Sequence, residues 1–127
     1  MTTESETKLA RYKTIEKEAD AWGRVIGVRR LKPSEKTKLT GMTTDLTGSE
    51  EVIGPNGEKI LVPHRLELSI AATVCVIDES PIPFPRNRGE LEAIQDRLDD
   101  EGIRAAGLAL IRLNNGVVDA PVEEAKN

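Results

Sequence analysis

Aromatic residues, cysteine and histidine are all scarce in this chain of 127 residues. It has one tryptophan, one tyrosine, one phenylalanine, one cysteine and one histidine. A single cysteine excludes an internal disulfide, and Cys75 lies in the most apolar stretch, where a small buried hydrophobic side chain is its expected role. His64 has no second histidine and no cysteine nearby, so a conventional zinc site is not expected. With 2% aromatics, the core must be built from Leu, Ile, Val and Ala.

The chain also lacks the residue groupings of common catalytic sites. It has no Ser/His/Asp or Cys/His arrangement, and the glycines of Gly54-Pro55-Asn56-Gly57 are not followed by the Lys-Ser/Thr of a phosphate-binding loop. The acidic cluster Asp96, Asp99, Asp100 and Glu101 lacks the spacing of a calcium loop and lies at predicted helix ends. We therefore expect a protein that is not an enzyme and that holds no metal or cofactor.

Neither sign of charge dominates, because 18 basic residues stand against 22 acidic ones. The net charge of -4 gives no reason to expect nucleic acid or an anionic membrane as partner. A local basic segment nevertheless runs from Arg24 to Lys38, with Glu35 as its one acid. A solvated surface is the favoured interpretation of this segment, and docking of an acidic partner is the alternative. The polar start MTTESETK has no apolar signal segment, so a cytosolic protein is expected.

Long hydrophobic runs are limited to one, which starts at Leu66 and ends in a proline-rich corner. Apolar residues at helical spacing over Leu66 to Ile77 predict a central core helix, too short to cross a membrane. The β-branched residues near its end support a second interpretation, a buried strand over Ala72 to Ile77. In the corner Asp78 to Pro85, three prolines in five residues end any helix.

The first half of the chain predicts two hairpins and a short helix. A turn at Asp20 to Gly23 precedes strand-forming residues at Val25 to Val28, which favours a hairpin. Pro33 is acceptable in a first helical turn and begins the short helix. The turn Gly54 to Gly57, between two aliphatic segments, gives the strongest hairpin signal.

Two further helices are predicted after the proline corner. Asn87 has the position of an N-cap, and the first helix carries the apolar stripe Leu91, Ile94 and Leu98. The sequence DDEG interrupts it, and a second stripe follows at Ile103, Ala106, Leu110 and Leu113. Asn114-Asn115-Gly116 is expected to end this helix.

Together these elements predict a small α+β domain that is mostly helical. It has an N-terminal β-hairpin, a second short hairpin, an apolar central helix and two C-terminal helices. The single domain is expected to span 12–114, between a flexible N-terminus at 1–11 and a flexible C-terminal tail at 115–127.

The order of these segments resembles the tail assembly chaperones of long-tailed bacteriophages and prophages. The resemblance rests on Ala21-Trp22-Gly23-Arg24 in a hairpin, a helix near Pro33, an Ala-rich apolar helix, Ile77-Asp78 with Pro81 to Pro85, and GELEAIQDRLDDEGIRAAGLAL. It covers Asp20 to Leu113. The insert Thr47 to Val62, with its own hairpin, departs from the family pattern.

What this resemblance implies is a non-enzymatic role. Such a protein binds the long helical tape-measure protein, keeps it soluble and assists the assembly of the tail tube around it. The implied partners are the tape-measure protein and the tail tube protein, in the host cytoplasm, with the chaperone absent from the mature virion; homo-oligomerisation stays open. The candidate partner-binding residues are Leu91, Ile94, Leu98, Ile103, Leu110 and Leu113, and packing in the core is the alternative role expected for most of them.

Two other interpretations come from different classes of function. One is a structural virion component, such as a small tail or head-completion protein. The other, less favoured, is a nucleic-acid-binding regulator that uses the basic segment Arg24 to Lys38.

Overall fold

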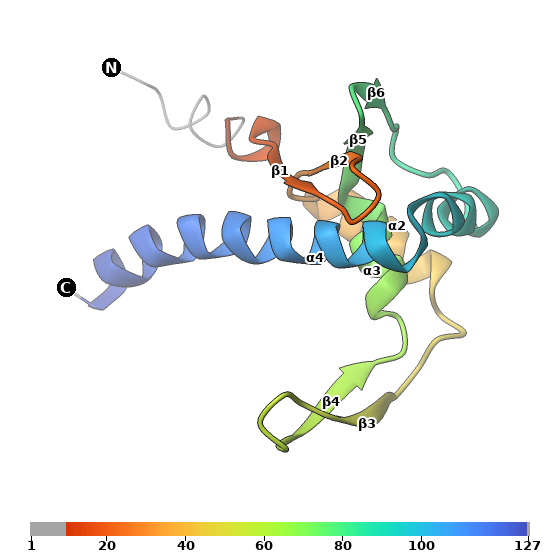
Figure 1. The fold of residues 1–127 in the computed structure, drawn as a ribbon. Helices are drawn as coiled ribbons and strands as arrows, with labels where there is room; N and C mark the ends of the chain where they lie inside the picture. The colour runs from red at the N-terminus through yellow and green to blue at the C-terminus, as the bar shows by residue number, and fades with distance from the viewer. Residues whose placement is uncertain (1–9, 127) are drawn as a thin grey trace.

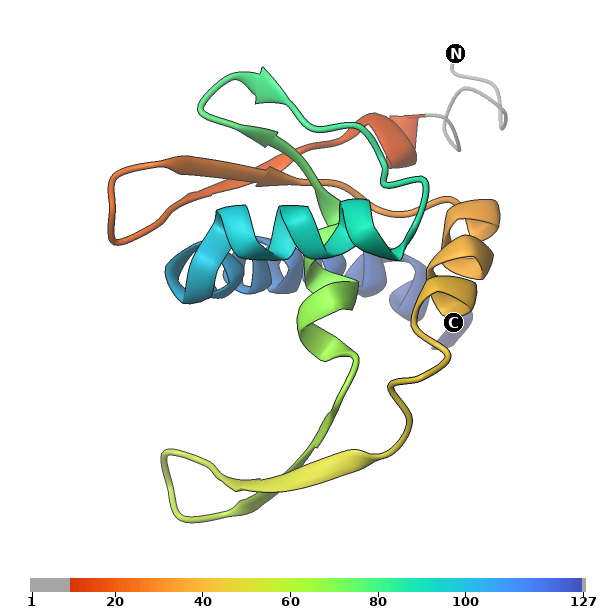
Figure 2. The same ribbon diagram turned by 90° about the vertical axis from the view of Figure 1, so that its right-hand side faces the viewer.

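A four-stranded antiparallel sheet forms one side of the molecule. The computed structural model describes the backbone of residues 10–126 and the side chains of residues 10–115. The strand order is β1-β2-β5-β6, and the strands are β1 (Glu16–Ala19), β2 (Val25–Val28), β5 (Val74–Ile77) and β6 (Ser80–Pro81). Figure 1 shows the sheet on one side of the long helix α4 (Arg88–Lys126), and Figure 2 shows α2 (Pro33–Met42) at one end of the body.

The predicted N-terminal hairpin is confirmed, and its turn is held by one carboxylate. Asp20 Oδ1 accepts the backbone N–H groups of Trp22 and Arg24 at 2.9 and 2.8 Å. Gly23 has a φ of 85°, a left-handed conformation that glycine adopts without strain. The sequence therefore determined this turn locally.

The predicted central helix is wrong over its last four residues. Helix α3 (Leu66–Thr73) ends at Thr73, and the next residue already belongs to β5. The alternative of a buried strand is the correct interpretation for Val74–Ile77. The physical reason is that this segment, β-branched except for Cys75, pairs with β2 and lies between β2 and β6, where the sheet supplies its backbone hydrogen bonds.

The pairing of β2 with β5 depends on a glycine. The register shifts between Gly27 and Val28, which marks a β-bulge. A Cβ atom at Gly27 would lie 2.3 Å from a methyl carbon of Val76 on the neighbouring strand. Only glycine allows this close approach of the two strands.

Helix α4 consists of two helical segments that meet at Asp99. Asn87 caps the start, because its Oδ1 accepts the backbone N–H of Glu90 at 2.9 Å. Asp99 has a φ of 59° and breaks the helix, as the sequence DDEG predicted. The predicted helix end at Asn114-Asn115-Gly116 was wrong, since α4 continues to Lys126. Helical hydrogen bonding continues here despite the poor intrinsic helix propensity of asparagine and glycine.

Arg24 joins the hairpin to this break in α4. Its guanidinium donates to the carbonyls of Arg97 and Leu98, both at 2.7 Å, which are among the carbonyls that the break leaves without helical partners. It also donates to Asp20 Oδ2 at 2.7 Å, and the Asp20 side chain is fully buried. Gly102 permits the tight packing here, because a Cβ atom would lie 2.9 Å from the Cβ of Leu98 and 3.3 Å from the Arg24 guanidinium.

The hydrophobic core lies between the sheet, α3 and both segments of α4. As expected from the composition, its fully or almost fully buried members are aliphatic. They are Ile26, Val28, Leu31, Leu68, Ala71, Ala72, Val74, Ile77, Leu91, Leu98, Ala105, Ala106, Ala109 and Leu113. The small alanines of α4 let α3 approach closely.

The second predicted hairpin is also confirmed, and it stands apart from the body. Strands β3 (Ser49–Ile53) and β4 (Lys59–Pro63) form a separate two-stranded sheet. Figures 1 and 2 both show it projecting away from the helices and the main sheet.

Replacing Arg24 tests the link between hairpin and helix. Arg24→Ala should lower the free energy of unfolding by about 3 kcal/mol, because it leaves the buried Asp20 carboxylate and the two helix-end carbonyls without their partner. Urea denaturation followed by circular dichroism measures this loss.

The matched control is Arg86→Ala, which removes another arginine that is paired with a carboxylate. Arg86 is 85% exposed in its ion pair with Glu90, so this change should leave the free energy of unfolding almost unchanged. Equal losses in the two variants would show that Arg24 is only a surface ion-pair partner.

Candidate functional site

A groove with a volume of about 430 Å³ opens between α2, α3 and α4. We call it the α2–α3–α4 groove. Its size falls within the range of roughly 300–1,000 Å³ that is common for ligand clefts. The lining residues are Arg29, Arg30, Leu31, Lys36, Leu39, Leu66, Ser69, Ile70, Thr73, Leu110 and Asn114.

Aliphatic side chains from all three helices form the floor of the groove. They are Leu39 from α2, Leu66 and Ile70 from α3, and Leu110 from α4. Leu66 is 40% exposed and the other three are half-buried. The floor therefore keeps apolar surface in contact with water, and covering it with apolar side chains would be favourable.

One side of the groove is built on an ion pair between Arg29 and Glu35. The Arg29 guanidinium donates to both oxygens of the Glu35 carboxylate at 2.8 Å, and the backbone N–H of Lys32 donates to one of them at 2.9 Å. The hydrogen bonds from Arg29 lower the pKa of Glu35 to about 2. Glu35 stays ionised, and its charge is matched by Arg29.

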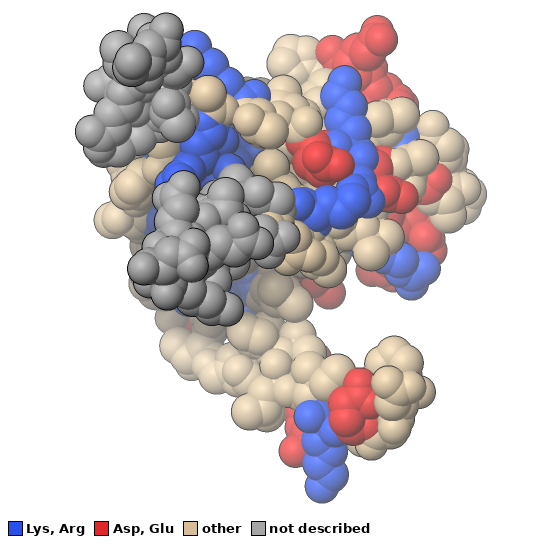
Figure 3. All heavy atoms as spheres, turned by 90° about the vertical axis from the view of Figure 1, so that its left-hand side faces the viewer, with Lys and Arg blue, Asp and Glu red and all other residues tan. Residues whose placement is uncertain are grey.

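The other charges on the groove rim are positive. Arg30 lines the groove and donates to the carbonyl of Leu113, while Lys36 lines it as an exposed side chain. On the face drawn in Figure 3, Lys and Arg atoms gather in one region, whereas acidic and basic atoms lie side by side elsewhere on that face. A partner with apolar and acidic side chains would match the groove.

The hydroxyl groups in the groove do not form a nucleophile. Ser69 donates to the carbonyl of Arg65 at 2.9 Å, and Thr73 donates to that of Ile70 at 2.6 Å. The lining, which lies wholly within the described residues, contains no histidine, cysteine or carboxylate that could serve as a base.

The two reactive side chains that the sequence singled out lie elsewhere. Burial raises the pKa of the Cys75 thiol, which opposes formation of a thiolate. The Nδ1 of His64 lies 2.9 Å from the carbonyl oxygen of Thr47, at the base of the β3–β4 hairpin. Within the described residues, no three His, Cys, Asp or Glu side chains come together as metal ligands would.

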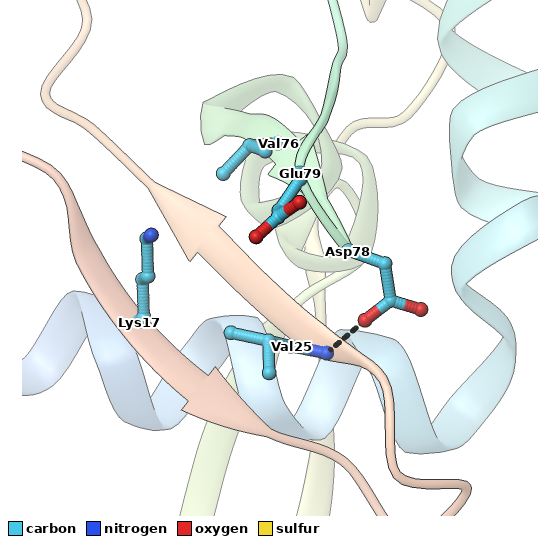
Figure 4. Close-up of a pocket in the computed structure, with 5 residues that line it drawn as sticks. All are labelled: Lys17, Val25, Val76, Asp78 and Glu79. Atoms are coloured by element: carbon cyan, nitrogen blue, oxygen red, sulfur yellow. Dashed lines mark hydrogen bonds between the residues drawn. The ribbon is translucent and has the colours of Figure 1, made fainter.

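A second cavity of about 300 Å³ lies beside the β5–β6 turn. Its lining is Lys17, Val25, Val76, Asp78 and Glu79. Figure 4 shows the Asp78 carboxylate directed at the backbone N–H of Val25, to which it hydrogen bonds at 2.8 Å. Asp78 thus ties the turn to β2, and we assign it a structural role.

The structure divides the six predicted partner-binding residues into two groups. Leu91, Leu98 and Leu113 are buried in the core and have no surface to offer a partner. Ile94, Ile103 and Leu110 are half-buried, and of these three only Leu110 lines the groove. For the buried leucines, the alternative of core packing is the one that holds.

Partial signals for the unassigned groove residues are present in the sequence. Leu66 and Ile70 were placed on the core helix, where their i, i+4 spacing puts them on one face. Leu39 was placed on the short helix that starts at Pro33. What the sequence lacked was any sign that these two faces meet beside the basic segment.

A comparison of the chain with protein-family models, with curated proteins and with solved structures finds no match. Among the residues that the structure describes, no helix is both long and apolar enough to cross a membrane.

The ion pair beside the groove predicts a pH dependence of stability. The pKa of Glu35 is about 2 in the folded chain against an ordinary value of 4.5, so its stabilising contribution is complete above pH 4.5 and is lost as the pH falls towards 2. Glu35→Gln should remove roughly 2 kcal/mol of unfolding free energy at pH 7 and almost none at pH 2. Urea denaturation of both proteins across this pH range measures the difference, and a difference that stays constant with pH would contradict the assignment.

Proposed function

We propose that this chain is a non-enzymatic assembly chaperone of the phage-tail type, which binds a helical segment of the tape-measure protein in the α2–α3–α4 groove. The observation that carries the proposal is the combination of an aliphatic floor with a basic rim in one groove. The order of segments from Asp20 to Leu113, which resembles that family, supports the choice of client.

An amphipathic helix with acidic residues fits this groove chemically. Its apolar face would cover Leu39, Leu66 and Ile70, and carboxylates beside that face would lie near Arg30 and Lys36. Such helices bind through side chains at i, i+3 or i+4, and i+7, and the long helical client that the resemblance implies would offer such a face. The apolar surface involved is modest, so binding would be reversible, as a chaperone that departs after assembly requires.

The same surface explains how the client would stay soluble. A long helix whose partner helices or tube subunits have not yet assembled exposes apolar stripes to water. Chaperone copies bound along the helix would shield these stripes in the host cytoplasm until tail tube subunits replace them. The chaperone would then be absent from the finished particle.

Co-expression with the tape-measure protein of the same genome tests the proposal directly. The wild-type chain should bring the tape-measure protein into the soluble fraction and co-purify with it. Leu66→Glu should weaken this binding about tenfold or more, since it places a carboxylate on the apolar floor.

Leu108→Glu is the matched control, because Leu108 is 47% exposed on α4 and lies outside the groove lining. It should leave binding unchanged, and circular dichroism should show both variants folded. Equal solubilisation by all three proteins would contradict the groove assignment. Recovery of the chain in purified particles would support a structural virion component instead.

A further inference from the structure

The β3–β4 hairpin has a surface that neither the core nor the groove uses. The structure describes all of the range 49–63, and no side chain in it is buried. Even the aliphatic side chains of Ile53 and Leu61 are 68% and 71% exposed. Five aliphatic residues lie on only two strands: Val52, Ile53, Ile60, Leu61 and Val62. A two-stranded sheet without a third strand or a covering helix is only marginally stable in water.

The hydrogen-bond pattern identifies the groups at the free edge of β4. The N–H of His64 donates to the carbonyl of Gly48, and the N–H of Gly54 donates to that of Glu58. The backbone groups of successive residues in a strand point alternately to its two sides. The N–H and C=O groups of Ile60 and Val62 therefore point towards β3. The N–H and C=O of Lys59 and Leu61, and the C=O of Pro63, therefore point to the open edge.

The free backbone groups of β4 can pair with the same groups in a second copy of the chain. An antiparallel pair of β4 strands related by a two-fold axis at Leu61 sets Leu61 opposite Leu61 and Ile60 opposite Val62. The two Leu61 residues then exchange N–H···O=C bonds, and each Lys59 N–H reaches the Pro63 carbonyl of the other copy. Pro63 has no N–H, so the Lys59 carbonyl opposite it receives no hydrogen bond, and the pairing rests on the bonds of Leu61 and of the Lys59 N–H groups.

The free edge of β3 does not have this property. An antiparallel pair of β3 strands related by a two-fold axis at Glu51 would set the two Glu51 residues directly opposite each other. It would also set Glu50 of each copy opposite Val52 of the other. Like charges in directly opposed positions destabilise a strand pair. Charge and side-chain pattern thus distinguish the two edges.

We propose that two copies of this chain associate through their β4 edges and form a continuous four-stranded antiparallel sheet, β3-β4-β4-β3. The pairing supplies each hairpin with the additional strands that it lacks. It also brings Val52, Ile60 and Val62 of both copies onto one face of the sheet, where they contact each other across strands. In Figure 3 the hairpin, at the bottom of the view, is set off from the body by a wide hollow, which leaves room for a second chain.

The proposal does not depend on the chaperone function. It concerns the insert Thr47 to Val62, which departs from the family pattern, and it uses no residue of the α2–α3–α4 groove. Its test is the oligomeric state of the purified chain without any client.

Sedimentation velocity over a dilution series, with two matched variants, provides the test. The wild-type chain should sediment with the mass of two chains and shift towards one chain on dilution. Leu61→Lys should weaken association at least about tenfold, since it sets two ammonium groups opposite each other across the two-fold axis. Within its own hairpin the new lysine faces Glu51, so the hairpin itself is not opposed by a like charge.

Ile53→Glu is the control, because it also replaces an exposed aliphatic residue of the hairpin and sets the new charge opposite Lys59 of the same hairpin. It lies on the β3 edge and should associate as the wild type does.

A wild-type chain that stays monomeric at every concentration would overturn the proposal. So would a Leu61→Lys variant that associates as strongly as the wild type, or equal losses in Leu61→Lys and Ile53→Glu. The last result would show that a face of the hairpin, rather than the β4 edge, makes the contact.

Discussion

The arrangement of this fold depends on the contact between Arg24 and the break in α4. The N-terminal hairpin and the C-terminal helix are far apart in the sequence, and the Arg24 guanidinium joins them by bonding the Asp20 carboxylate and the carbonyls of Arg97 and Leu98. Burial of Asp20 opposes its ionisation, but the hydrogen bonds from Arg24 outweigh this and keep its pKa below the ordinary value. The contact fixes where the second segment of α4 begins, and so where Leu110 lies relative to α2 and α3.

Local signals in the sequence predicted the elements well, and non-local contacts decided the rest. The Asn87 cap, the first turn at Pro33 and the turn Gly54 to Gly57 each involve residues close in sequence, and the structure has all three. Residues 74–77 fit both a helical spacing and a strand composition. Only their pairing with β2 selects the strand, and no pattern within the segment contains that information.

The candidate site illustrates the same limit. The basic segment and the apolar stripes were each visible in the sequence, but the groove arises because α2 and α3 bring Leu39, Leu66 and Ile70 beside Arg30. Leu91 and Leu98, which had the clearest helical stripe, are instead the residues that the sheet and α3 bury. A strong apolar stripe on a small domain belongs first to its own core, and the binding surface that we propose uses the half-buried residues at its margin.

Hydrogen exchange of the chain with and without its helical client tests the central claim most directly, namely that the α2–α3–α4 groove is the binding surface. Our account predicts that amide exchange slows in α2, in α3 and in the part of α4 around Leu110, and stays unchanged at the turn of the N-terminal hairpin. Protection confined to other parts of the chain, with α2 and α3 exchanging as in the free protein, would contradict it.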